Sequence, residues 1–101
     1  LKEDAKLLEQ LGCFAIVLEK IPAKLAEEVA KSVRVPIIGI GAGSAVDGQV
    51  LVSQDFFGMF VDYKPKFVRQ SLNLHELMTG AVSQYITDVK AQTFPNESEQ
   101  Y

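Results

Sequence analysis

Glu19 is the residue of this sequence whose type and placement most clearly suit chemistry. It follows Cys13–Leu18, a continuous apolar run that is typical of a strand buried on both faces of a parallel sheet. A carboxylate at the carboxyl end of such a strand lies at the mouth of the sheet, where apolar surroundings favour proton uptake. Glu19 is therefore a candidate general base. The structural alternative is a solvated acid paired with Lys20 or Lys24.

Glycine occupies alternate positions near the end of the apolar stretch Val35–Gly43. Glycine lets the backbone approach a ligand closely, so the series indicates either a ligand site or a tightly packed turn. It is not a dinucleotide fingerprint, because Ser44 and Val46 stand where G-x-G-x-x-G requires glycine, and no P-loop motif is present. We expect Asp47-Gly48 to form a plain turn in which the carboxylate bonds local amides.

Other reactive side chains are isolated. His75 stands beside Glu76 at helical spacing and is expected on the surface or in a cap, and Cys13 is expected to pack. The sequence shows no cluster of His, Cys and Asp with metal-ligand spacing. We predict no complete metal site within these residues.

The elements that must position Glu19 alternate between helix and strand, which predicts a wound α/β fold with a parallel sheet. Glu27 and Lys31 lie four residues apart on the second helix, a spacing that favours an ion pair.

The tail from Thr93 is polar and is expected to be loose unless Phe94 and Tyr101 dock. Apolar periodicity predicts helices over 1–12, 22–33, 65–70 and 72–91, and strands over 13–18, 35–40 and 49–52.

Composition limits the functional classes. The 101 residues are 48% hydrophobic with a net charge of -3, enough for one small core and without the cationic surface that nucleic acid requires. No apolar run reaches the roughly 18 residues of a membrane helix. The single cysteine and the lack of a leader pattern favour the cytoplasm. The uncapped start at Leu1 leads us to expect that the chain begins inside a larger fold.

The sequence resembles the C-terminal portion of the ketopantoate hydroxymethyltransferase family. The similarity covers nearly the whole chain in order, and the combination is more specific than any single motif. The segments that carry it are Val17-Leu18-Glu19-Lys20-Ile21-Pro22, Pro36 to Gly43, Asp47-Gly48-Gln49-Val50-Leu51-Val52, Pro65-Lys66-Phe67-Val68, and Tyr85 through Val89 to Phe94-Pro95.

The resemblance implies a (β/α)8 TIM barrel related to phosphoenolpyruvate mutase and isocitrate lyase. Residues 1–101 would form the C-terminal fragment of that single domain: the last three βα units, with strands Cys13–Leu18, Val35–Ile40 and Gln49–Val52, plus terminal helices. Such a barrel takes about 250 residues, so the chain cannot close it alone. The family also implies a homo-oligomer.

The resemblance also implies an activity in pantothenate and coenzyme A biosynthesis. A hydroxymethyl group passes from 5,10-methylenetetrahydrofolate to 3-methyl-2-oxobutanoate, with Mg²⁺ chelating the keto acid. Glu19 matches the base that removes the C3 proton, and Ile40, Val50 and Val52 match the apolar wall around the branched end of the substrate. The metal ligands match no position here and belong to the N-terminal part, and the folate contacts are unassigned. The fragment alone should be inactive.

Two alternatives remain open. One is a lyase or mutase of the same barrel group acting on another keto acid, which the Asp47 to Val52 motif disfavours. The other is a non-catalytic half-barrel that self-associates through the open edge of its first strand and an uncovered apolar face.

Overall fold

A three-stranded parallel sheet in the order β1-β2-β3 organises the first half of the chain. The computed structural model describes all of residues 1–101 and divides into two compact units, residues 1–52 with 65–68, and residues 53–64 with 69–101. The first unit contains α1 (Lys2–Gln10), β1 (Ile16–Glu19), α2 (Ala23–Ala30), β2 (Ile37–Ile40) and β3 (Gly48–Gln49). The second contains α3 (Ser53–Phe56), α4 (Leu74–Lys90) and the 3-10 turn η1 (Glu97–Glu99). The alternating α/β order and the parallel sheet predicted from the sequence are confirmed.

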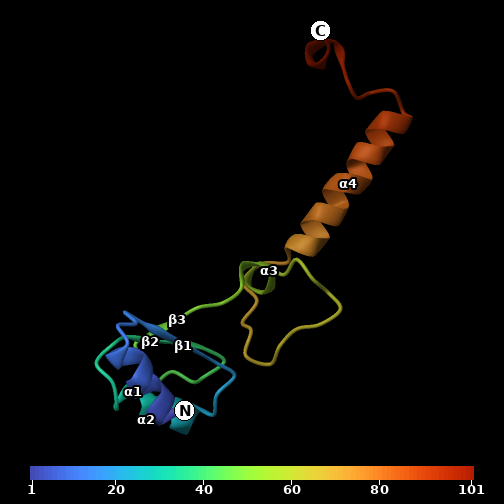
Figure 1. Cartoon of the computed structure of the whole chain (residues 1–101). Helices are drawn as coiled ribbons and strands as arrows, with labels where there is room; N and C mark the ends of the chain where they lie inside the picture. Colours follow the sequence, from blue (N-terminus) through green and yellow to red (C-terminus); the bar gives the residue numbers. More distant parts are fainter. The chain divides into compact units, whose positions relative to one another are not determined.

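The core of the first unit lies between the sheet and two helices. Ala5 of α1 and Ala26 and Val29 of α2 form one buried cluster with strand residues that include Ile16 and Ile37. Both helices therefore cover the same face of the sheet (Figure 1). The prediction that the first strand is buried on both faces is wrong for this chain, because no helix of the first unit covers the other face, where Val17 is 60% exposed.

The strands are also shorter than predicted. Residues 13–15 precede β1, and Phe14 among them is 90% exposed. The predicted strand over 49–52 is limited to Gly48–Gln49 in the structure. The physical reason is that its partner ends: β2 stops at Ile40, and Gly41 then turns away at a φ of 63°. The Val50 amide still bonds to the Gly39 carbonyl oxygen, but the residues after Val50 have no strand to pair with.

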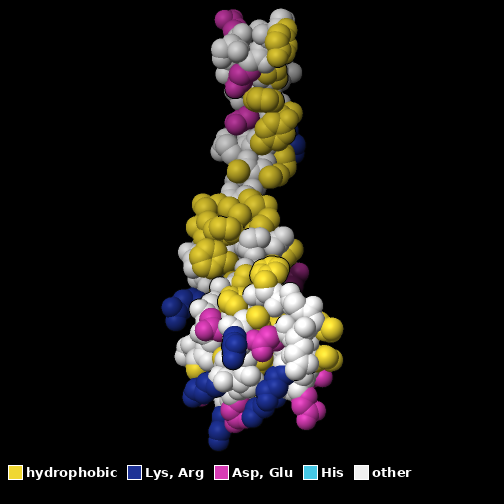
Figure 2. Space-filling view, turned by 60° about the vertical axis from the view of Figure 1, so that its left-hand side comes forward, with side chains coloured by type: hydrophobic (Ala, Val, Ile, Leu, Met, Phe, Trp, Pro, Cys, Tyr) yellow, Lys and Arg dark blue, Asp and Glu magenta, His cyan; other side chains and the backbone are white.

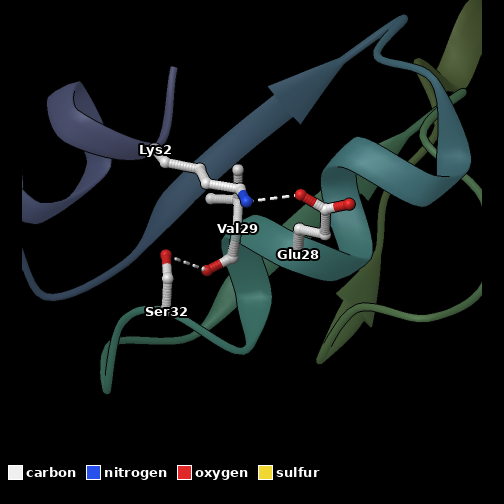
Figure 3. Close-up of polar contacts among 4 residues, drawn as sticks. All are labelled: Lys2, Glu28, Val29 and Ser32. Atoms are coloured by element: carbon white, nitrogen blue, oxygen red, sulfur yellow. Dashed lines mark hydrogen bonds and ion pairs between the residues drawn. The ribbon is translucent and has the colours of Figure 1, made fainter.

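Polar contacts on the outside of this unit connect α1 to α2 and close the end of α2. Lys2 of α1 forms an ion pair with Glu28 of α2, and the Ser32 hydroxyl donates to the Val29 carbonyl oxygen at 2.8 Å (Figure 3). The predicted pair of Glu27 with Lys31 is present at 2.5 Å. Both ion pairs are exposed, so each contributes at most about 1 kcal/mol.

Glu9 makes a less obvious connection. Its carboxylate Oε1 accepts hydrogen bonds from the backbone amides of Arg34 at 2.6 Å and Val35 at 3.2 Å. These amides lie in the connection from α2 to β2, where no backbone acceptor serves them. Glu9 therefore holds the entry of the central strand against α1.

The second unit is dominated by α4, which confirms the long helix predicted over 72–91. Asn73 caps its start, because the Asn73 side chain accepts from the Glu76 amide at 3.2 Å. None of its 17 residues is buried. Figure 2 shows hydrophobic side chains gathered along one side of this helix, and the exposed ones are Leu77, Met78, Val82, Tyr85, Ile86 and Val89.

Two further predictions concern residues 65–70 and the tail. Residues 65–70 form a single turn rather than a helix, closed by the Val68 amide bonding to the Pro65 carbonyl oxygen at 3.0 Å. Tertiary packing holds this turn, since Val68 is only 5% exposed. In the tail, Phe94 docks edge-on against Tyr85 with 5.2 Å between ring centroids, whereas Tyr101 is fully exposed. No helix is both long and apolar enough to cross a membrane.

Candidate active site at the carboxyl end of the sheet

Glu19 is the last residue of β1, as the sequence predicts. In the parallel register it pairs with Ile40, the last residue of β2. Backbones of paired strands lie about 4.8 Å apart, and paired residues of a parallel sheet point to the same face. The candidate base and the first predicted wall residue are therefore direct neighbours at one rim.

Val50 extends the row of rim residues that begins with Glu19 and Ile40. Gly39 pairs with Gln49, and the Val50 amide donates to the Gly39 carbonyl oxygen at 3.0 Å, which places Val50 level with Ile40. The three positions predicted from different segments thus lie side by side in the order Glu19, Ile40, Val50. Val52 lies two residues farther on, beyond the paired part of the sheet.

Solvent reaches this row from the face that no helix covers. Glu19 is exposed, Val50 and Val52 are 45% and 48% exposed, and only Ile40 is buried, at 7%. The apolar enclosure expected around Glu19 is thus absent in this chain. Alternation along the strand explains the exposure, since Ile16 and Leu18 point to the helix-covered core and Glu19 points to the opposite face.

The residue after Glu19 has an unusual backbone. Lys20 has a φ of 53°, a left-handed conformation that costs a non-glycine residue about 1–2 kcal/mol. Its amide donates to the Ile40 carbonyl oxygen at 2.8 Å, which fixes the chain as it leaves the strand. Backbone strain of this kind is concentrated at functional sites. The sequence named Lys20 only as a possible partner of Glu19, and its backbone angle was not predicted, because lysine carries no signal of a left-handed conformation.

The glycine-rich connection after β2 is a tightly packed turn. Gly41 has a φ of 63°, and a Cβ atom there would lie 2.7 Å from the ring of Phe67. Glycine is required both for the backbone angle and for the ring. Phe67 is thus a residue of this rim that sequence reasoning did not assign to the site, since nothing local in the sequence connects positions 41 and 67.

Asp47 does more than close a local turn. Its amide donates to the Ile37 carbonyl oxygen at 3.0 Å, and its carboxylate Oδ2 accepts from the Ile37 amide at 2.8 Å. This reciprocal pair extends the pairing of β2 with β3 by one step. The prediction of bonding to local amides is wrong, because the partner lies ten residues earlier in the central strand.

The arrangement suits removal of a proton from carbon. An exposed carboxylate stands at the rim, next to apolar side chains that can hold the hydrocarbon part of a small substrate. Val17 lies on the same face two residues before Glu19 and adds a further apolar surface. His75 lies in the other unit and Cys13 precedes β1, and neither belongs to the row. No group of three or more His, Cys, Asp and Glu side chains in the chain could hold a metal ion.

Comparison with known proteins identifies the family of the chain. A sequence profile described as ketopantoate hydroxymethyltransferase matches residues 1–97. The chain belongs to the ketopantoate hydroxymethyltransferase family. This confirms the resemblance seen in the sequence motifs.

Individual relatives agree with this family. The chain is 61% identical over 99 residues to a 3-methyl-2-oxobutanoate hydroxymethyltransferase of Flavobacterium johnsoniae, a match that covers 98% of the chain and 36% of the relative. Proteins with the same name from Phocaeicola vulgatus and Salinibacter ruber are 60% and 54% identical over 101 residues, the whole chain, which is 37% and 38% of their lengths. The chain therefore spans little more than a third of these relatives.

Proposed function

We propose that the protein to which this chain contributes transfers a hydroxymethyl group to 3-methyl-2-oxobutanoate. The one-carbon donor is 5,10-methylenetetrahydrofolate and the product is 2-dehydropantoate, a precursor of pantothenate and coenzyme A. The observation that carries the proposal is the family match over residues 1–97, together with relatives that are 3-methyl-2-oxobutanoate hydroxymethyltransferases. We assign the activity to the longer protein and expect the chain alone to be inactive.

We further propose that residues 1–101 are the C-terminal part of a (β/α)8 barrel, with β1, β2 and β3 as its last three strands. Two observations support this placement. The helices cover one face of the sheet only, as on the outside of a barrel, and β1 is an edge strand with an open side where a preceding strand would pair. The row of Glu19, Ile40 and Val50 would then line the interior at the catalytic end of the barrel.

Glu19 is proposed to act as the general base. Its carboxylate takes the C3 proton of the keto acid, and the electrons of the broken C–H bond form the enolate, whose C3 then bonds to the methylene carbon of the donor. Both carbon–nitrogen bonds of that methylene group break, water supplies the hydroxyl of the product, and tetrahydrofolate is released. Ile40, Val50 and Val52 would surround the two methyl groups next to C3. Closure of the barrel would exclude water from this wall and supply the apolar surroundings that Glu19 lacks in the chain alone.

The family resemblance implies Mg²⁺, and we tested whether these residues could bind it. They do not fit, because the chain assembles no cluster of metal-ligating side chains. We propose that its ligands lie in the part of the protein outside residues 1–101. The cytoplasmic location and the homo-oligomeric state also stay predictions.

A chimera tests the proposed function. In the P. vulgatus relative, the 101 aligned residues are replaced by those of this chain, to which they are 60% identical. We expect the purified chimera to form 2-dehydropantoate from 3-methyl-2-oxobutanoate and 5,10-methylenetetrahydrofolate, whereas the same relative without the segment should form none. A chimera that folds like the parent and yields no product would contradict the proposal.

A second candidate is a non-catalytic, self-associating module. The exposed sheet face around Val17 and the uncovered side of α4 favour it, because exposed apolar patches drive pairing between chains. Mixing the chain with the remaining part of the relative discriminates the two. Recovered activity supports the enzyme, and a stable inactive oligomer supports the module.

A further inference from the structure

Gln49 makes a hydrogen bond that connects β3 to the turn after β2. Its side-chain Nε2 donates to the Gly43 carbonyl oxygen at 2.8 Å. Gln49 pairs with Gly39 in the sheet, and its Nε2 lies 3.5 Å from where a Cβ of Gly39 would be, an ordinary contact distance. Gln49 lies on the opposite face of the sheet from Glu19, so it does not face the proposed substrate.

The turn that Gln49 holds is packed directly on the start of α2. A Cβ atom at Gly43 would lie 2.5 Å from the Cβ of Ala23 and 3.1 Å from its Cα. Ala23 is the first residue of α2 and follows Glu19 by four positions. The turn after β2 therefore packs against Ala23, the last residue of the segment from Glu19 to Ala23.

The same segment is fixed at its beginning. The Lys20 amide donates to the Ile40 carbonyl oxygen at 2.8 Å, and Lys20 is held in the left-handed region. The stretch from Glu19 to Ala23 is thus held by β2 at one end and by Gly43 at the other. Gln49 is the side chain that donates a hydrogen bond to Gly43.

We propose that Gln49 is a positioning residue for Glu19. It acts through Gly43 and Ala23: by holding the turn against α2, it fixes the direction in which the Glu19 carboxylate leaves the strand. This inference rests on the proposed function, in which Glu19 is the base. Proton abstraction is sensitive to such placement, because a shift of about 1 Å in a reacting group costs up to roughly 100-fold in rate.

The first test follows exchange of the C3 hydrogen of 3-methyl-2-oxobutanoate with D2O, catalysed by the chimera in the absence of folate. Gln49→Leu keeps the approximate size but cannot donate, and Gln49→Glu places a carboxylate against the Gly43 carbonyl. We expect either change to lower kcat for exchange about tenfold while KM for the keto acid changes less than about twofold. Gln100→Leu, a substitution in the exposed tail, should leave both constants unchanged.

The second test needs no activity. Amide hydrogen exchange of the 101-residue chain compares Lys20 and Ile16, whose amides bond to the Ile40 and Pro36 carbonyl oxygens at the two ends of β1. Gln49→Leu should speed exchange at Lys20 about fivefold or more and leave Ile16 unchanged. Equal acceleration at both amides would indicate general destabilisation and overturn the inference.

The two tests also separate this inference from the proposed function. If the unmodified chimera is active, Glu19→Gln abolishes exchange and Gln49→Leu has no effect, the positioning role of Gln49 is wrong and the proposed function stands. An inactive chimera that folds would contradict the proposed function, while the amide exchange still tests the contact itself.

Discussion

Replacing Gly41 with alanine tests the packing of the rim most sharply. The added methyl group would lie 2.7 Å from two ring atoms of Phe67, a separation that real Cβ atoms essentially never show. The backbone would also have to keep a φ of 63°. Both penalties fall on the turn that follows Ile40, so the change should loosen the carboxyl end of the sheet.

The size of the effect follows from the two penalties. A left-handed backbone costs an L-residue about 1–2 kcal/mol, and forcing an extra methyl into a packed contact costs about 1–3 kcal/mol. Gly41→Ala should therefore destabilise the first unit by about 2–5 kcal/mol. Each 1.4 kcal/mol is a factor of about ten in an equilibrium constant, so amide protection at Lys20 and Ile16 should fall at least 30-fold.

Two other glycines provide matched controls. Gly12 has a φ of 92° and nothing within 4 Å of an added Cβ, so Gly12→Ala carries the backbone penalty alone. Gly80 lies inside α4 with the same open space, so Gly80→Ala should stabilise that helix by about 1 kcal/mol. Amide exchange measured residue by residue reports the change in stability of the first unit for Gly12→Ala and Gly41→Ala, and of the second unit for Gly80→Ala. A Gly41→Ala cost no larger than that of Gly12→Ala would refute the Phe67 contact.

Three further outcomes are expected. Asp47→Ala should free the Ile37 amide and weaken the pairing of β2 with β3 by about 1–3 kcal/mol, read from exchange at that amide, whereas Asp47→Asn keeps an acceptor and should lose less. Val50→Ala in the chimera should raise KM for 3-methyl-2-oxobutanoate about tenfold, and Val61→Ala, equally apolar and 63% exposed, should not. The chain alone should associate in light scattering, and a monodisperse monomer at high concentration would contradict an uncovered sheet face.

Local patterns predicted the elements of the first unit well. The apolar stripe of α2, the ion pair of Glu27 with Lys31 and the end of β1 at Glu19 all follow from periodicity over a few residues. Strand lengths could not be predicted in this way. They depend on whether a neighbouring strand is present to pair with, and that is decided by the turn at Gly41 and by the position of β1 at the edge of the sheet.

The candidate site was predictable where strand order alone places residues. Glu19 and Ile40 come to one rim because the carboxyl ends of parallel strands meet there. The contacts that support the rim were not predictable. Phe67 reaches Gly41 across 26 positions, and the partner of Gln49 is a backbone carbonyl that no side-chain pattern marks. The exposure of Glu19 agrees with the alternative of a solvated acid, and the apolar surroundings expected around it are absent. A continuous apolar run does not show which face of its strand a helix covers.

The role of Glu19 is tested most directly by C3 hydrogen exchange of 3-methyl-2-oxobutanoate in D2O, catalysed by the chimera without folate. Glu19→Gln removes the proton acceptor and keeps the shape, so exchange should fall at least about 100-fold while the keto acid still binds. Glu3→Gln, a change of the same kind at an exposed position of α1, should leave exchange intact. Exchange by the Glu19→Gln chimera at the unmodified rate would contradict the assignment of Glu19 as the base.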